Sequence, residues 1–130
     1  MIQEILDYIA NGINDLGLSM PASEGSLPPS DGIAVYQGAG APTDEFLDRG
    51  KEHELYITVN AKNADQTVAL GTLETIHKHF TTLKAYTPGG DYEIINIATG
   101  TAPNYLGKDA NNQQWLYGSI LKVTVYQTKE

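Results

Sequence analysis

The stretch EHELYITVNAKNADQTVALGTLETIHKHFTTL, residues 52–83, changes its hydrophobic period halfway and decides the fold class. In residues 52–62 apolar and polar side chains alternate, which predicts a β-strand with one buried face. From Asn63, which we expect to cap a helix with Gln66 as its capping-box partner, the apolar residues recur in steps of four and three. This spacing predicts an amphipathic helix whose buried stripe is Ala69, Leu73, Ile76, Phe80 and Leu83.

The segments on either side complete an α+β pattern. Helical spacing predicts another helix over residues 2–16, and β-forming residues predict strands at 33–37, 91–99 and 116–127. Three connections rich in Gly, Pro or polar residues join them, at 21–32, 38–52 and 100–115. We therefore expect one domain over residues 1–130, with a single antiparallel or mixed β-sheet of about four strands. Two helices should pack on one face, and the interconnecting loops should be long.

Composition excludes several functional classes. The 130 residues include no Cys, which excludes disulfides, thiolate zinc sites and iron–sulfur clusters. The net charge is −8, and all of it arises in residues 1–60, which hold ten carboxylates and two basic side chains. Such a charge argues against nucleic-acid binding through phosphate contacts. No apolar run approaches the roughly 20 residues of a transmembrane helix, so we expect no membrane association.

Motifs for catalysis and for metal binding are absent from the sequence. His77 and His79 are two residues apart on a predicted helix and so point in different directions, and we interpret all three histidines as surface residues. No Ser lies in a GxSxG motif, and Gly38-Ala39-Gly40 is not followed by GK[ST]. We therefore predict no catalytic, cofactor-binding or metal-binding residue, no cofactor and no enzymatic activity.

Two segments carry candidate interaction residues. Asp44, Glu45 and Asp48 flank Phe46 and Leu47 in the second connection. Grouped carboxylates can perform acid–base chemistry or hold a divalent ion, but the ligand rhythm of a calcium loop is missing, so we favour an acidic arm. Eight of the eleven aromatic residues are Tyr, a residue enriched at protein interfaces. We predict an interface formed by Phe46, Leu47, Pro103, Tyr105, Leu106, Lys108 and Trp115.

The last third of the chain resembles a known family. The stretch TAPNYLGKDANNQQWLYGSILKVTVYQ, residues 101–127, is similar to the ending of small tail-terminator proteins of long-tailed bacteriophages, which are often labelled minor capsid proteins. The shared pattern is a Pro, an aromatic residue, Leu-Gly, a polar turn, a second aromatic residue and a closing strand. In this chain these are Pro103, Tyr105, Leu106-Gly107, residues 108–114, Trp115 and residues 119–127.

The resemblance implies a structural protein of the virion. Such a protein forms a homo-oligomeric ring, expected to be hexameric, at the head-proximal end of the tail tube, where it ends tube polymerisation and joins the tail to the head. Its partners would be copies of itself, the tail tube protein and a head-completion or connector protein. DNA would only pass through the lumen, past Asp44, Glu45 and Asp48. The expected location is the head–tail junction, after assembly in the host cytoplasm.

Three alternatives stay open from the sequence. Another neck component, such as a head-completion or stopper ring protein, would have a similar pattern. An acidic DNA mimic that inhibits host nucleases would use the carboxylates as phosphate substitutes. A small hydrolase would need a nucleophile or metal pattern that the sequence does not contain.

Overall fold

The structure, a computed structural model, describes residues 2–18, 20–25, 31–37, 46–47, 52–83, 92–109 and 113–127. Two helices and six strands lie within these ranges. In chain order they are α1 (Ile2–Asp15), β1 (Ala22–Glu24), β2 (Gly32–Gln37), β3 (Phe46–Leu47), β4 (Glu52–Asn63), α2 (Gln66–Thr81), β5 (Tyr92–Asp109) and β6 (Gln114–Gln127).

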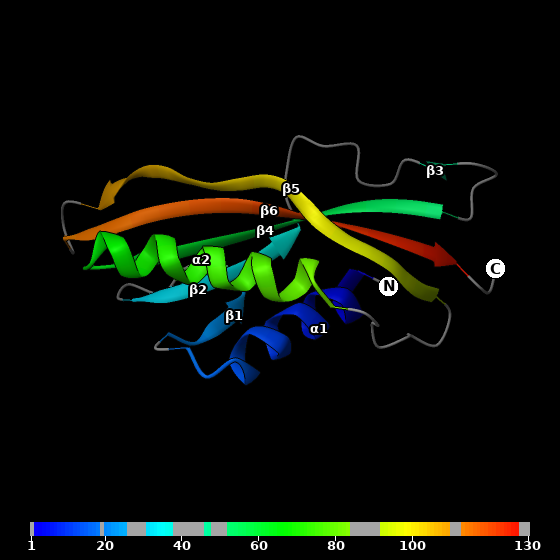
Figure 1. Ribbon diagram of the computed structural model, residues 1–130, viewed down its shortest axis with the longest axis horizontal. Helices are drawn as coiled ribbons and strands as arrows, with labels where there is room; N and C mark the ends of the chain where they lie inside the picture. The colour runs from blue at the N-terminus through cyan, green and yellow to red at the C-terminus, as the bar shows by residue number, and fades with distance from the viewer. Residues whose placement is uncertain are drawn as a thin grey trace.

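The strands form one mixed sheet in the order β1-β2-β4-β6-β5, with β3 paired to the start of β4. Only β1 and β2 run parallel, and the other pairs are antiparallel. Both helices lie on the same face of the sheet (Figure 1), α1 against β1 and β2 and α2 against β4, β5 and β6. The predicted α+β fold with one sheet and two helices on one face is confirmed. The sheet has two strands more than expected, because β1 and β3 are too short to leave a periodic pattern.

Alternating burial along the central strand produces the core. Leu55, Ile57, Val59 and Ala61 of β4 are buried, while the residues between them are half-buried on the opposite face. The helices pack against the sheet face that carries the buried residues. Their apolar stripes are formed by Ile5, Ile9 and Ile13 from α1, and by Ala69, Leu73, Ile76 and Phe80 from α2. The strand and helix predicted from residues 52–83 therefore supply much of the core.

The expected loop over residues 100–115 is wrong. Strand β5 continues to Asp109 and β6 begins at Gln114, so most of this segment is the distal part of a long hairpin. The segment contains Gly, Pro and Asn, which have low β-propensity, and it lacks regular alternation. Register shifts between Thr99 and Gly107 accommodate these residues within the paired strands.

The start of α2 also differs from the prediction. Asn63 is the last residue of β4, and the N-cap is Asp65, whose carboxylate accepts a hydrogen bond from the backbone N–H of Thr67 at 2.9 Å. The side-chain oxygen of Asn63 instead accepts from the backbone N–H of Asp65 at 2.8 Å. Asn63 therefore shapes the turn before the helix, and an Asp provides the cap.

The interpretation of the histidines as surface residues is wrong for two of them. His53 and His77 are buried. His77 lies on α2 beneath β5, where its Nδ1 is 2.9 Å from the hydroxyl oxygen of Thr99 and its buried Nε2 has no hydrogen-bond partner. Burial lowers the pKa of His77, because an imidazolium in this position would lose its hydration.

This burial predicts a loss of stability in mild acid. The unfolded chain keeps His77 near its ordinary pKa of about 6.5, so below that pH the unfolded state binds more protons than the folded state. The free energy of unfolding should therefore fall as the pH decreases from 7.5 to 5. Urea denaturation at several pH values measures this dependence, which should be smaller in His77→Gln than in His79→Gln. Equal dependence in both variants would contradict the prediction.

Candidate functional site

The distal half of the β5–β6 hairpin, residues 101–109 and 114–119, forms an arm at the end of the sheet where β4 ends and α2 begins (Figure 1). The structure brings together on this arm five of the predicted interface residues: Pro103, Tyr105, Leu106, Lys108 and Trp115. Tyr105 and Leu106 are 53% and 56% exposed, as the sequence predicted. They are exposed on a paired strand and not in a loop.

An aromatic cluster lies on the helix side of the arm. Tyr105 is paired with Tyr117, and its ring centre lies 5.6 Å from that of Tyr117 and 6.0 Å from that of Trp115. The Nζ of Lys108 lies 4.8 Å from the centre of the Trp115 ring, a cation–π geometry. Gln66, the first residue of α2, donates a hydrogen bond to the Tyr117 hydroxyl at 2.7 Å. The exposed Tyr105 is therefore supported by neighbours on a regular element.

A hollow of about 220 Å³ lies on the outer side of the arm, on the sheet face that the helices leave open. Its depth depends on Gly118, because a Cβ there would come within 2.7 Å of Leu106 and 2.9 Å of the Asn60 side-chain oxygen. Asn60 also donates a hydrogen bond to the Tyr36 hydroxyl at 3.0 Å. The lining residues are uncharged: Tyr36, Thr58, Asn60, Thr101, Asn104, Leu106, Gly118, Ser119 and Ile120.

Pro103 lies in the largest irregularity of the arm. The pairing with β6 shifts between Thr101 and Asn104, and Pro103 has no N–H to contribute to a ladder. The side-chain amide of Asn104 donates to the carbonyls of Ala102 and Gly118, at 2.9 and 3.2 Å. These side-chain bonds replace ladder bonds and hold the irregular strand against β6.

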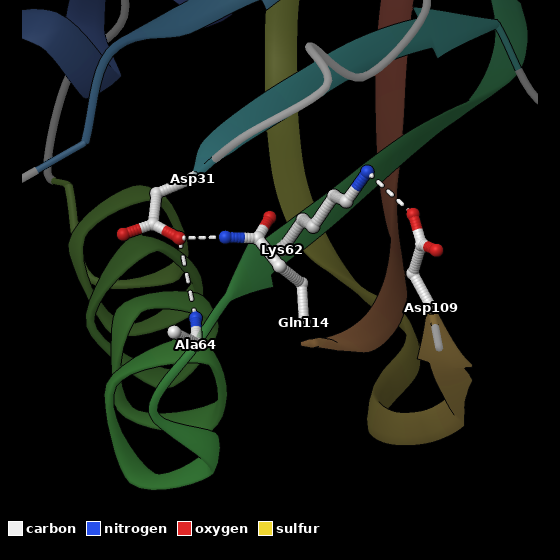
Figure 2. A network of polar contacts seen from close by, with 5 residues as sticks. All are labelled: Asp31, Lys62, Ala64, Asp109 and Gln114. Carbon is white, nitrogen blue, oxygen red and sulfur yellow. Dashed lines mark hydrogen bonds and ion pairs between the residues drawn. The ribbon is translucent and has the colours of Figure 1, made fainter. Parts of the chain in front are cut away.

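An ion pair and a hydrogen bond join the far end of the arm, where β5 ends and β6 begins, to the rest of the fold, as Figure 2 shows. Lys62 of β4 is 8% exposed and forms an ion pair with Asp109 at 3.1 Å. The carboxylate of Asp31, just before β2, accepts hydrogen bonds from the backbone N–H of Ala64 and from the side-chain amide of Gln114. We call these four side chains, Asp31, Lys62, Asp109 and Gln114, the clamp.

Sequence reasoning missed the clamp. Its residues lie in three separate segments, and only the strand pairing places them together. One signal was present: Lys62 continues the β4 strand among half-buried and buried positions, where a Lys needs a partner. That signal does not identify Asp109.

The other predicted interface and acidic-arm residues are only partly described. Asp44, Glu45 and Asp48 lie outside the described residues, while Phe46 and Leu47 form β3 and pair with His53 and Glu52. Trp115 pairs with Asn63 at the other end of β4. Ten residues of an antiparallel strand span about 34 Å, so β3 and the arm lie at opposite ends of the sheet.

An acidic edge at α1 and β1 is a further feature that sequence reasoning did not assign. Glu4, Asp7, Asp15 and Glu24 are all exposed there, and Gln3 donates hydrogen bonds to Asp7 and Glu24. A hydrogen bond between the two carboxyl groups raises the pKa of Glu24 and lowers that of Asp7, as expected for carboxyl groups that share a proton. Four of the ten carboxylates of residues 1–60 therefore gather at this edge.

Among the residues that the structure describes, no helix is long and apolar enough to cross a membrane. In the same part of the chain, no three His, Cys, Asp or Glu side chains form a group that could hold a metal ion.

The clamp predicts a measurable coupling between Lys62 and Asp109. Lys62→Met should lower the free energy of unfolding by about 1–3 kcal/mol, because it leaves a partly buried carboxylate without its cation. Lys62→Met combined with Asp109→Leu should recover part of that loss. A double-mutant cycle by urea denaturation isolates the pair from the other contacts of both residues.

The matched control for the clamp is a second, more exposed ion pair. Lys122 and Glu54 are 3.5 Å apart and their side chains are 35% and 29% exposed. A pair with this exposure contributes roughly 0–1 kcal/mol, so Lys122→Met should have a smaller effect. Equal effects of Lys62→Met and Lys122→Met would contradict the role of the clamp.

Comparison with known proteins agrees with the family that the last third of the chain resembles. No curated protein matches the chain. A family model described as bacteriophage tail terminator protein matches residues 9–120, which include the second half of α1, all of α2 and the arm. The chain therefore belongs to the bacteriophage tail terminator protein family and is a structural protein of the phage tail.

Proposed function

We propose that this protein forms a ring, expected to be hexameric, at the head-proximal end of the tail tube, where it ends tube polymerisation and joins the tail to the head. The family supports a place in the tail, and the structure supplies surfaces suited to assembly. The partners would be further copies of the chain, the tail tube protein and a head-completion protein.

The observation that carries this proposal is the arm. Tyr105 and Leu106 are exposed to more than half, are adjacent in sequence and face opposite sides of one hairpin. The clamp holds the far end of that hairpin through the Lys62–Asp109 ion pair and the hydrogen bond from Gln114 to Asp31. Exposed aromatic and aliphatic side chains on a rigid support are typical of contact sites, because little conformational entropy is lost when they bind.

The two ends of the sheet suit a protein that occupies the end of the tube and so prevents further tube subunits from binding. Tube subunits add to one another because each presents complementary surfaces at its two ends. A terminator must match the tube at one surface and present a different surface beyond it, so that no further tube subunit binds. In this chain the arm and β3 lie at opposite ends of β4 and differ in sequence.

The acidic residues of the second connection would have a separate role. Asp44, Glu45 and Asp48 would face the channel of the ring, where their charge repels the phosphates of passing DNA. Repulsion would keep the DNA from adhering to the wall.

Tail length tests the proposed function. Virions assembled with Leu106→Ser in place of the wild-type chain should show tubes of excess length, and the yield of complete particles should fall on the order of tenfold because a contact residue is lost. Electron microscopy measures both. Leu106 is exposed, so the variant should fold.

The matched control is Ile95→Ser, which removes an aliphatic side chain of similar exposure, 47%, from the same strand away from the arm. Tail length should stay uniform in this control. Tubes of indefinite length in the presence of the wild-type protein, or a C-terminal label on the protein that is absent from the neck of the virion, would contradict the function.

Ejection of DNA tests the acidic channel. Replacing Asp44, Glu45 and Asp48 with Asn, Gln and Asn should slow DNA ejection, because the wall no longer repels the phosphates. Ejection kinetics by light scattering measure the rate, and the effect should diminish as the salt concentration rises. Unchanged kinetics would remove the support for a channel-facing position.

A further inference from the structure

The hollow on the outer sheet face is suited to one kind of side chain. Leu106 and Ile120 provide apolar walls, while Asn60, Asn104 and the Tyr36 hydroxyl provide hydrogen-bonding groups. A side chain that combines an apolar ring with a hydroxyl satisfies both kinds of wall, and Tyr is such a side chain. A charged side chain would lose hydration there without an opposite charge among the lining residues.

The charge distribution favours a second copy of this chain as the source. Each copy has a net charge of −8, so two copies repel unless they meet where carboxylates are absent. The hollow has no charged lining residue, and Glu54 and Lys122 on the same face neutralise each other at 3.5 Å. The acidic edge at α1 and β1 offers no such surface.

Tyr105 is the most exposed of the described Tyr side chains and meets these requirements on the copy. It is packed against Trp115 and Tyr117, and its neighbour Lys108 adds no carboxylate to the surface that would meet the hollow. Within one chain it cannot enter the hollow, because Tyr105 faces the helix side of the arm and the hollow lies on the outer side.

We infer that Tyr105 of one copy inserts into the hollow between Tyr36, Asn60 and Leu106 of the next copy. The contact joins two different surfaces, so repeating it continues head-to-tail, as a closed ring requires. The inference rests on the proposed ring and identifies its subunit contact. Gly118 is essential to it, because a larger residue would fill the hollow.

Site-directed cross-linking tests the contact, and the natural absence of Cys removes the background. Lys108→Cys, which keeps Tyr105 and lies next to it on the same side of the arm, and Thr58→Cys are produced as separate chains, mixed during assembly and treated with a short bis-maleimide. The mixture should give a covalent pair containing one chain of each kind. Neither variant alone should do so, and the assemblies can be taken from purified rings or from virions.

The control mixture combines Lys108→Cys with Tyr126→Cys. Tyr126 lies on the same sheet face as Thr58, at the end away from the arm, and is 42% exposed. Equal cross-linking of the control, or cross-linking of Lys108→Cys with itself, would overturn the contact. In addition, Tyr105→Ala should weaken association about tenfold or more, as loss of a central aromatic residue does.

The result separates the contact from the proposed function. Rings and uniform tails without the expected cross-link would overturn the contact and leave the function standing. A chain that remains single at every concentration, and in particles, would overturn the proposed function together with the contact.

Discussion

The fold depends on β4 being paired on both sides while it buries every second side chain. Its buried residues, Leu55, Ile57, Val59 and Ala61, lie on the sheet face that the helices cover, and its partners β2 and β6 continue the same face. A shift of the register by one residue would move this apolar row to the open face, so burial fixes the register strongly. With the register of β4 fixed, the position of its last residues, Lys62 and Asn63, is fixed too.

The position of the arm follows from that register. Lys62 is placed where Asp109 can reach it, and the turn after Asn63 places the Ala64 N–H near Asp31. The clamp therefore joins the irregular end of the hairpin to the most regular strand of the sheet. In the proposed assembly this arrangement would keep the contact residues in place, because the strands that carry them are paired and are joined to β4 by the clamp.

The sequence predicted the helices and strands whose hydrophobic periodicity reflects the burial of one face. It did not predict the part of β5 that becomes a strand through pairing with β6. Residues 52–83 alternate and then recur at helical spacing because one face of each element meets the core. Residues 100–109 have no such pattern, since they become a strand through pairing with residues 114–120, and such pairing is not encoded locally. His77 was misassigned for a related reason: it lies one position from Ile76 on the helix, and only the place of β5 makes it buried. The exposure of Tyr105 and Leu106 was predictable because both lie among polar residues in the sequence. Large side chains that are exposed in this way indicate a binding partner.

The exposed carboxylates and the residues of the proposed contact lie in different parts of the molecule, and this separation constrains how copies can assemble. The exposed carboxylates of α1 and β1 lie at one edge of the sheet, whereas the hollow is uncharged and the exposed aromatic residue of the arm has a Lys beside it. A chain of net charge −8 can pack against itself only where desolvation removes no unpaired carboxylate from water. Tyr105 on the helix side of the arm and the hollow on the outer face both satisfy that condition. The proposed contact would therefore join a side chain of β5 to a hollow lined by β2, β4, β5 and β6, while the acidic edge remains available to solvent or to a basic partner.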